Sequence, residues 1–258
     1  MIDLHLIGIG TGNPDHLTRE AIRVLNGADL LLVPQKGDDK ADLADLRRMI
    51  CAQVLEHDVP IVGFDVPTRA ADRPYLDAVN DWHDAIAECW RAKIAEHLPR
   101  GGHVGLMVWG DPSLYDSSLR IAARLPAAGL PMRTHVVPGI TSLQVLTAAH
   151  GIALSRLAGP VTITTGRRLR DTGWPDGAER VAVMLDNGGA FEVLEGDDYF
   201  IWWGAYLGMA AQMLISGPLR NVAGEILARR AQARAAQGWI MDIYLIERRR
   251  ARCHEPAA

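Results

Sequence analysis

Three short segments of the chain combine glycine with polar residues, a combination suited to binding a polar ligand. Residues 8–14 read Gly-Ile-Gly-Thr-Gly-Asn-Pro, residues 109–115 read Trp-Gly-Asp-Pro-Ser-Leu-Tyr, and residues 138–142 read Pro-Gly-Ile-Thr-Ser. Glycine lets the backbone approach a ligand closely, while carboxylate and hydroxyl side chains offer hydrogen-bonding groups. Each segment alone also suits an ordinary turn or helix cap. Only their joint position in a fold would indicate a binding site.

The first segment is similar to a dinucleotide-binding turn but differs from that motif in two places. The third glycine of Gly-x-Gly-x-x-Gly would stand where the chain has Asn13, and Pro14 occupies the start of the helix that would bind phosphate. The next apolar run also ends in Pro34 and Gln35, where an acidic residue would bind ribose. A nicotinamide-dependent reductase is therefore the alternative hypothesis.

The glycine-containing segments follow apolar runs that are typical of buried strands. Such strands are predicted over residues 4–9, 29–33, 60–64, 104–109 and 133–137. Helices are predicted between them, the longest over residues 75–98, with its apolar stripe in the core. This alternation predicts an α/β domain with a mostly parallel sheet over residues 1–140. The three segments then follow strands one, four and five, at the edge where such sheets bind ligands.

The second half, residues 141–258, is predicted to hold more strands than helices. Its strands are expected over residues 161–165, 181–185, 199–203, 212–216 and 239–246. One helix is expected over residues 140–149 and another over residues 223–236. This density of strands predicts a second α/β domain with a mixed sheet.

Composition excludes several classes of protein. The chain has 258 residues and a formal net charge of -4, which argues against nucleic acid as a partner. No apolar segment approaches the ~20 residues needed to span a bilayer, so we expect no membrane partner. The N-terminus lacks the features of a signal peptide, so we expect a cytoplasmic location. The 3 cysteines and 9 histidines show no ligand spacing, so no metal site is expected.

In their order, the three segments and the Gly-Ile-Ala-Leu run at residues 151–154 closely resemble the tetrapyrrole methylases, the class III S-adenosylmethionine methyltransferases. The resemblance covers nearly the whole chain. It implies two α/β domains with the cofactor in a cleft between them, a tetrapyrrole substrate and a homodimer. Residues 81–83, 214–219 and 238–245 are most similar to the branch of the family that methylates a cobalamin-pathway precorrin at C-1 while an acetyl group leaves as acetate.

The resemblance also implies which residues form the site. Carried over by motif, the residues expected to contact the cofactor are Gly10, Thr11, Gly110, Asp111, Leu114, Thr141, Ser142, Leu185, Leu207 and Gly208. Many relatives carry Pro where this chain has Thr11. Arginine and lysine suit the substrate's carboxylates, and the candidates are Lys36, Arg47, Arg69, Arg73, Arg167, Arg168 and Arg170. The arginines after Gly166 are favoured because a turn there would let their guanidinium groups converge.

Our hypothesis for the loss of the acetyl group is that water adds to its carbonyl, and a base would assist that addition. Asp111 and Asp186 at strand ends, and His103, are the candidate bases. Three alternative functions are also considered for the chain. They are a methylase of another precorrin or of a modified histidine in the diphthine branch, a nicotinamide-dependent reductase, and a non-catalytic tetrapyrrole carrier.

Overall fold

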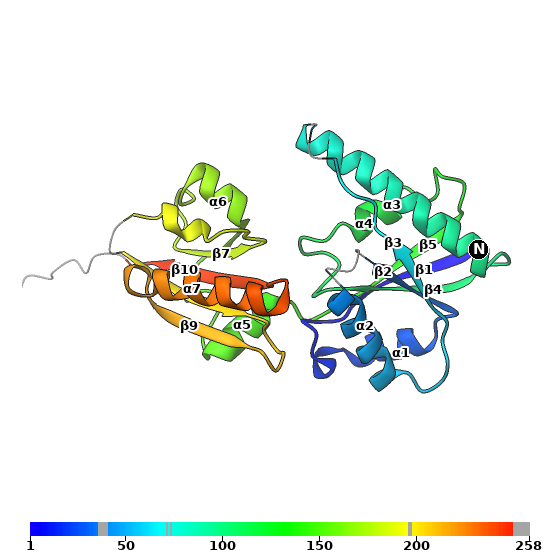
Figure 1. The fold of residues 1–258 in the computed structure, drawn as a ribbon, viewed down its shortest axis with the longest axis horizontal. Coiled ribbons are helices and arrows are strands. Elements are labelled where there is room, and N and C mark those ends of the chain that lie inside the picture. The colour runs from blue at the N-terminus through cyan, green and yellow to red at the C-terminus, as the bar shows by residue number, and fades with distance from the viewer. Residues whose placement is uncertain (36–40, 71, 73, 196–197, 250–258) are drawn as a thin grey trace, which may run out of the picture. The chain divides into compact units, whose positions relative to one another are not determined.

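The structure, a computed structural model, describes residues 1–35, 41–70, 72, 74–195 and 198–249, with the side chains of residues 41 and 42 outside the description. The chain divides into two compact units, unit 1 (Met1–Thr141) and unit 2 (Ser142–Ala258). Each unit is built on its own five-stranded sheet. Figure 1 draws the two units as a ribbon.

Unit 1 has an all-parallel sheet with the strand order β3-β2-β4-β1-β5. Its strands are β1 (Ile2–Gly8), β2 (Leu30–Gln35), β3 (Ile61–Asp65), β4 (Gly102–Val108) and β5 (Met132–Val137). The five strands predicted for this half are all present. Because β1 lies between β4 and β5, the loops after these three strands leave the sheet side by side.

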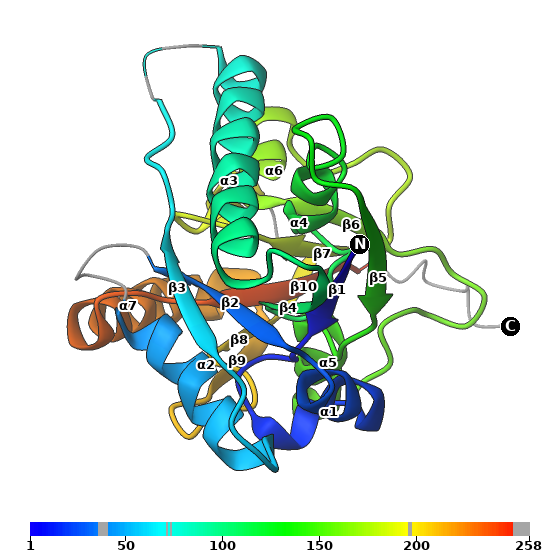
Figure 2. The same ribbon diagram turned by 90° about the vertical axis from the view of Figure 1, so that its right-hand side faces the viewer.

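Helices cover both faces of this sheet. They are η1 (Pro14–His16), α1 (Arg19–Asn26), α2 (Ala41–Val54), α3 (Tyr75–His97) and α4 (Ser118–Ala122). Figure 2 shows α3 and α4 on one face and α1 and α2 on the other. Leu4 and Leu6 of β1 pack with Trp90 of α3, whereas Ile7 packs with Leu25 of α1, as the alternation of side chains along a strand requires. The core stripe predicted for α3 is confirmed by Ile86, Trp90 and Ile94, while Tyr75 is exposed.

Unit 2 has a mixed sheet with the order β6-β7-β10-β8-β9. Its strands are β6 (Thr162–Thr165), β7 (Arg180–Met184), β8 (Tyr199–Ala205), β9 (Met213–Pro218) and β10 (Asp242–Arg248). β6 and β7 are parallel, while β10 runs antiparallel to both β7 and β8, and β9 runs antiparallel to β8. The predicted mixed sheet is therefore confirmed.

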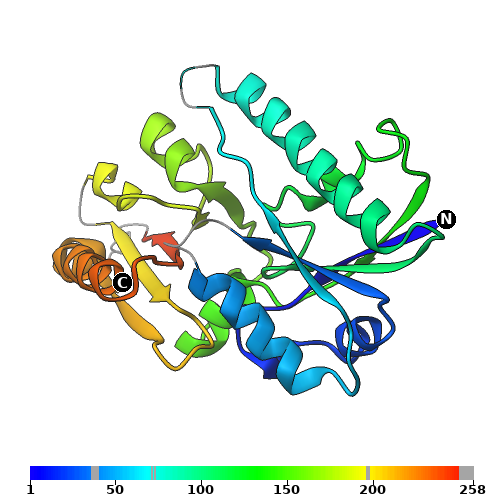
Figure 3. The same cartoon turned by 45° about the vertical axis from the view of Figure 1, so that its right-hand side comes forward.

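The helices of unit 2 are α5 (Ser142–His150), α6 (Gly166–Thr172), η3 (Ala190–Val193) and α7 (Leu219–Gln237). Leu169 of α6 and Ile226 of α7 share one core with Val183, Trp203 and Tyr244 of the sheet. Helix α7 packs against β8 and β9 (Figure 3), and α5 contacts β8 and β10. This packing holds the ends of β7 and β8 in fixed positions.

Two local predictions were wrong. The segment after Gly166 is a helix rather than a turn, because the Thr165 hydroxyl accepts a hydrogen bond from the Arg168 amide and so caps the first turn of α6. The last strand begins at Asp242 rather than three residues earlier. Gly238 ends α7 in the left-handed conformation, and the following segment binds Tyr206 instead of a neighbouring strand.

Candidate functional site

The loops after β1 and β4 are joined directly at the carboxyl edge of the unit 1 sheet. The Gly110 amide donates to the Gly10 carbonyl at 2.7 Å, and the Gly10 amide donates to the Gly110 carbonyl at 3.4 Å. This pair forms an isolated antiparallel bridge between two chain segments that otherwise run parallel. Both glycines have left-handed backbones, with φ of 72° and 64°, a conformation that glycine adopts without steric cost.

The third loop joins the other two through the Asp111 carboxylate. Its Oδ2 accepts a hydrogen bond from the Gly139 amide at 2.9 Å, and its Oδ1 accepts from the amide and the hydroxyl of Ser113. Burial opposes the charge on Asp111, but these hydrogen bonds outweigh it and leave the pKa of the carboxyl below its ordinary value. Asp111 is therefore ionised at neutral pH and connects the second loop to the third.

Close backbone packing at this edge requires glycine at two further positions. A Cβ atom added to Gly139 would meet the Gly110 carbonyl oxygen and would lie 2.8 Å from Gly8 Cα. A Cβ atom added to Gly8 would lie 2.6 Å from the Gly139 nitrogen. The three loops thus pack backbone against backbone, and the structure brings together the three segments that the sequence singled out.

The other residues predicted at this edge occupy varied surroundings. Thr141 is buried. It lies beside Gly110, because a Cβ atom added to Gly110 would be 3.7 Å from Thr141 Cα. The Thr11 hydroxyl lies 3.1 Å from His16 Nδ1. Leu114 is half-buried and its amide donates to the Asp111 carbonyl at 3.2 Å. Ser142 is half-buried at the first residue of α5, which belongs to unit 2.

Unit 2 brings a second group of predicted residues to one edge of its own sheet. β7 and β8 both run antiparallel to β10, which lies between them, so their carboxyl ends reach the same edge. Leu185 directly follows β7, and Leu207 and Gly208 follow β8 after Tyr206. The Gly208 amide donates to Gln212 Oε1 at 2.8 Å.

Two of the residues at this edge have unusual backbone conformations. Leu185 and Tyr206 have φ of 52° and 48°, in the left-handed region that costs a non-glycine residue about 1–3 kcal/mol. The Tyr206 hydroxyl donates to the Trp239 carbonyl at 2.5 Å, which helps to hold that residue in place. Leu185 is 62% exposed despite its apolar side chain. A strained and exposed leucine at a strand end is a feature that often marks a ligand contact.

Asp186, a candidate base, is buried and accepts four hydrogen bonds. Its Oδ1 accepts from Arg170 at 2.9 Å and from the Gly188 amide at 3.1 Å, and its Oδ2 accepts from the Ala190 amide at 2.6 Å and from the Tyr244 hydroxyl at 2.8 Å. Burial raises the pKa of the Asp186 carboxyl, but these donors outweigh burial and leave the pKa lowered. With both oxygens bound in this way, the carboxylate fixes the loop that follows Leu185.

A buried ion pair that sequence reasoning missed supports the same edge. Arg230 of α7 donates to both carboxylate oxygens of Asp242, at 2.7 and 3.0 Å, and to the Asp186 carbonyl at 2.7 Å. Burial disfavours the charge on Arg230, yet the bonds to Asp242 leave its pKa raised. The available signal was helical spacing, because Arg230 shares one buried stripe with Ile226 and Ala233.

The basic residues predicted to bind substrate are not gathered in one turn. Arg167 and Arg168 are exposed on the first turn of α6, where consecutive residues point in different directions. Arg170 pairs with Asp186. Lys36 and Arg73 lie outside the described residues. His103 is at the amino end of β4 beside His5, at the opposite edge of the sheet from Gly110, so it is not part of this site.

Two absences hold over the described part of the chain. There, no group of three or more His, Cys, Asp or Glu side chains is arranged to hold a metal ion. In the same residues, no helix has the length and apolarity to cross a membrane.

Comparison with known proteins gives consistent matches. The family model described as Tetrapyrrole (Corrin/Porphyrin) Methylases matches residues 3–223. A precorrin-6A synthase [deacetylating] from Sinorhizobium sp is 46% identical over 94% of this chain and 94% of its own length.

Solved structures agree in fold. A cobalamin synthesis related protein (CobF) from Corynebacterium diphtheriae superposes with a TM-score of 0.82 and 36% identity, covering 96% of this chain and 99% of that chain. A uroporphyrin-III C-methyl transferase from Thermus thermophilus, complexed with S-adenyl homocysteine, has a TM-score of 0.56 at 17% identity, covering 95% and 92% of the two chains. The fold is therefore shared over 95–96% of this chain.

Proposed function

Because the chain belongs to the tetrapyrrole methylase family, we propose that it is an S-adenosylmethionine-dependent methyltransferase of cobalamin biosynthesis. Its proposed reaction converts precorrin-5 to precorrin-6A, with a methyl group added at C-1 and the acetyl group released as acetate. The observation that carries this proposal is the 46% identity to a precorrin-6A synthase [deacetylating], because it extends over 94% of both chains and so includes both units.

The proposed cofactor suits the two sheet edges in different ways. At the unit 1 edge, the carbonyl oxygens of Gly10 and Gly110, which can each accept a second hydrogen bond, lie close to Thr141. At the unit 2 edge, the exposed Leu185 offers an apolar contact for a nucleoside base. S-adenosylmethionine, when bound, supplies an electrophilic methyl group. The residues proposed to contact it are Gly10, Thr11, Gly110, Asp111, Leu114, Thr141, Ser142, Leu185, Leu207 and Gly208.

Positioning is the main task that the protein's own residues perform in this proposal. Asp111 holds the Gly139 amide and so fixes the third loop against the other two. Correct placement of two reactants can contribute about 7–11 kcal/mol of barrier lowering. Arg167 and Arg168 stay candidates for the substrate carboxylates, because both are exposed cations. Few side chains then need to act in proton transfer.

A base for the attacking water is proposed to be Asp111, with Asp186 as the second candidate. We expect Asp111→Asn to slow acetate release by about 10²- to 10⁴-fold, the usual contribution of a general base. Asp186→Asn tests the other carboxylate in the same assay. Two quantities are measured, the rate of acetate release and the dissociation constant of S-adenosylhomocysteine. Loss of a carboxylate that only positions the loops would change mainly the dissociation constant.

The matched control for these variants is Asp45→Asn, because Asp45 is an exposed carboxylate that pairs only with Arg48 among the described residues. It should behave as the unmodified protein does. Full acetate release by both Asp111→Asn and Asp186→Asn would remove both residues from the chemistry.

Incubation of the purified protein with precorrin-5 and S-adenosylmethionine tests the proposed reaction as a whole. We expect mass spectrometry to detect one product that has gained a methyl group and lost an acetyl group, with one acetate released for each. Methyl gain without acetyl loss would indicate a methylase of another precorrin. Failure to bind S-adenosylhomocysteine in calorimetric titration would count against any methylase activity.

The assembly and location of the protein are also proposed from family membership. We infer that the chain forms a homodimer that acts in the cytoplasm. Light scattering coupled to size-exclusion chromatography should give a mass of twice the chain's 28.2 kDa. A monomer mass at micromolar concentration would contradict the dimer.

A further inference from the structure

Unit 1 contains a cavity of about 220 Å³ next to Trp109, the residue that precedes Gly110 in the second glycine-containing loop. The cavity lies among α2, α3, α4 and the carboxyl ends of β2, β3 and β4. Its principal lining side chains are Arg47, Phe64, Trp82, Trp90, Leu106 and Trp109. The walls are mostly aromatic and aliphatic.

One cation is buried in this apolar wall. Arg47 is only 7% exposed, and its guanidinium donates to two backbone carbonyls, Met107 at 3.3 Å and Leu43 at 3.2 Å. Burial lowers the pKa of Arg47 to about 10, so the group is still charged at neutral pH. It lies 4.9 Å from the centre of the Trp109 ring. Within the described residues, no carboxylate forms an ion pair with it.

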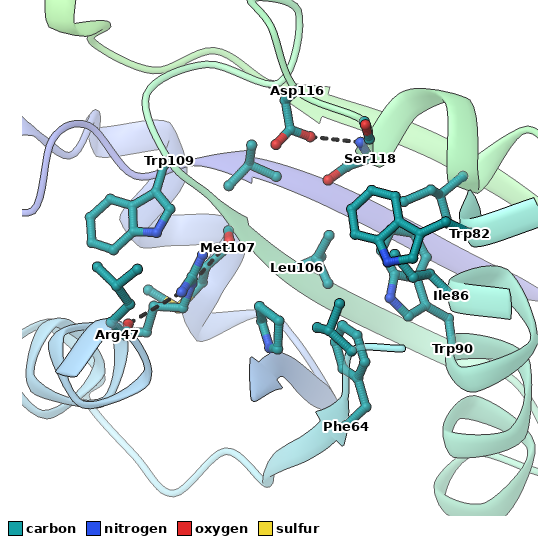
Figure 4. Close-up of a pocket in the computed structure, with 16 residues that line it drawn as sticks. Arg47, Phe64, Trp82, Ile86, Trp90, Leu106, Met107, Trp109, Asp116 and Ser118 are labelled. Atoms are coloured by element: carbon teal, nitrogen blue, oxygen red, sulfur yellow. Dashed lines mark hydrogen bonds between the residues drawn. The ribbon is translucent and has the colours of Figure 1, made fainter. Parts of the chain in front are cut away.

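Among the described residues, the acid that attracts Arg47 does not form an ion pair with it. Asp116 also lines the cavity and attracts Arg47 through space, but its carboxylate accepts a hydrogen bond from the Ser118 amide at 2.6 Å. Figure 4 shows Asp116 and Ser118 together, apart from Arg47. A buried charge without a direct counter-ion is unfavourable, and an anion in the cavity would relieve that cost.

Two further donors line the same space. The indole nitrogens of Trp90 and Trp109 are buried, and neither has a hydrogen-bond partner among the described residues. Figure 4 shows Trp109 next to Arg47 on one flank of the cavity, with Trp82, Ile86 and Trp90 on the opposite flank. Buried N–H groups without partners are uncommon and call for an explanation. A ligand with acceptor oxygens would provide one.

We propose that this cavity binds a carboxylate group, with Arg47 as its cation and the indole N–H of Trp109 as an additional donor. The inference rests on the proposed function, in which the carboxylate comes either from a side arm of the tetrapyrrole or from the acetate that the reaction releases. Sites for whole drug-sized ligands measure about 300–1,000 Å³, so a cavity of about 220 Å³ suits such a group but not the macrocycle.

The decisive variant is Arg47→Met, which keeps much of the side-chain length and removes the charge. Loss of a charge-assisted pair should weaken binding of the carboxylate by about 10- to 100-fold. The matched control is Arg48→Met, because Arg48 is the next residue of α2 but is exposed and pairs with Asp45 at the surface. The control should keep the binding and the activity of the unmodified protein.

Two readouts distinguish the sources of the carboxylate. If a side arm of the tetrapyrrole occupies the cavity, Arg47→Met raises KM for the tetrapyrrole, and free acetate inhibits the unmodified protein competitively against it. If released acetate occupies the cavity, Arg47→Met leaves that KM unchanged and abolishes product inhibition by acetate. Equal KM and equal inhibition by acetate in both proteins would overturn the proposal, even if Arg47→Met also lowered the melting temperature.

A direct binding measurement separates this proposal from the proposed reaction. Sodium acetate added to the unmodified protein should change tryptophan fluorescence saturably, whereas sodium chloride at the same ionic strength should not. Trp109→Phe keeps an aromatic ring and removes the N–H, so it should weaken acetate binding by about 3- to 10-fold. This variant replaces Arg47→Met in the test if Arg47→Met does not fold. Absence of a saturable acetate signal would reject the cavity site, whether or not the protein makes precorrin-6A.

Discussion

Gly139→Ala is expected to weaken binding of S-adenosylhomocysteine by about 5- to 150-fold. An added methyl group would overlap the Gly110 carbonyl oxygen and approach Gly8 Cα to 2.8 Å. The obstructing atoms are backbone, so relief requires the third loop to move away from the other two. Overpacking of this kind costs about 1–3 kcal/mol, and the movement would also lengthen the bond from the Gly139 amide to Asp111. Calorimetric titration measures the affinity.

Gly27→Ala is the matched control, because it makes the same chemical change in the same unit. A Cβ atom at Gly27 would lie 3.5 Å from the Arg23 carbonyl oxygen, an ordinary van der Waals contact. This variant should bind S-adenosylhomocysteine within about twofold of the unmodified protein. If Gly139→Ala bound it equally well, close packing of the three loops would not be needed for the cofactor.

Arg230→Met is expected to destabilise unit 2 by about 3–5 kcal/mol, the usual cost of removing one partner from a buried ion pair. The substitution leaves the Asp242 carboxylate buried, with a bond from the Trp203 indole at 2.8 Å but without its cation. It also removes the bond to the Asp186 carbonyl, which follows the strained Leu185. Urea unfolding monitored by tryptophan fluorescence measures the change.

Two companion variants identify the cause of that loss. Arg229→Met changes the neighbouring, exposed arginine of α7 and should shift the free energy of unfolding by less than about 0.5 kcal/mol. Adding Asp242→Asn to Arg230→Met removes the uncompensated charge and should restore part of the stability. The test compares the change in the free energy of unfolding that Asp242→Asn causes alone with the change it causes in Arg230→Met. Equal changes would mean that the two residues act independently.

Both edges rely on interactions that join segments far apart in the chain. Asp111 binds Gly139 across 28 residues, and Arg230 of α7 binds the carbonyl of Asp186 across 44 residues. In each unit a buried or half-buried aspartate thus fixes a loop that begins where a strand ends. The same arrangement explains why both aspartates are held ionised by hydrogen bonds that outweigh their burial.

Much of the fold could be predicted from the sequence because its signals are local. Apolar runs of strand length identified all ten strands. The loops after strands one, four and five were assigned to one edge, because strands that alternate with helices form parallel sheets whose carboxyl ends coincide. The confirmed contact between Gly10 and Gly110 follows from that topology.

Only the tertiary structure showed what the buried member of two neighbouring, chemically identical residues contacts. Arg47 contacts a carbonyl 60 residues away while Arg48 lies at the surface, and Arg230 pairs with Asp242 while Arg229 is exposed. The left-handed backbone of Leu185 was equally hidden, because packing around it rather than its own preference imposes that conformation. Local patterns determine where strands and turns form, whereas burial, charge pairing and strain arise from contacts between segments that only the folded chain brings together.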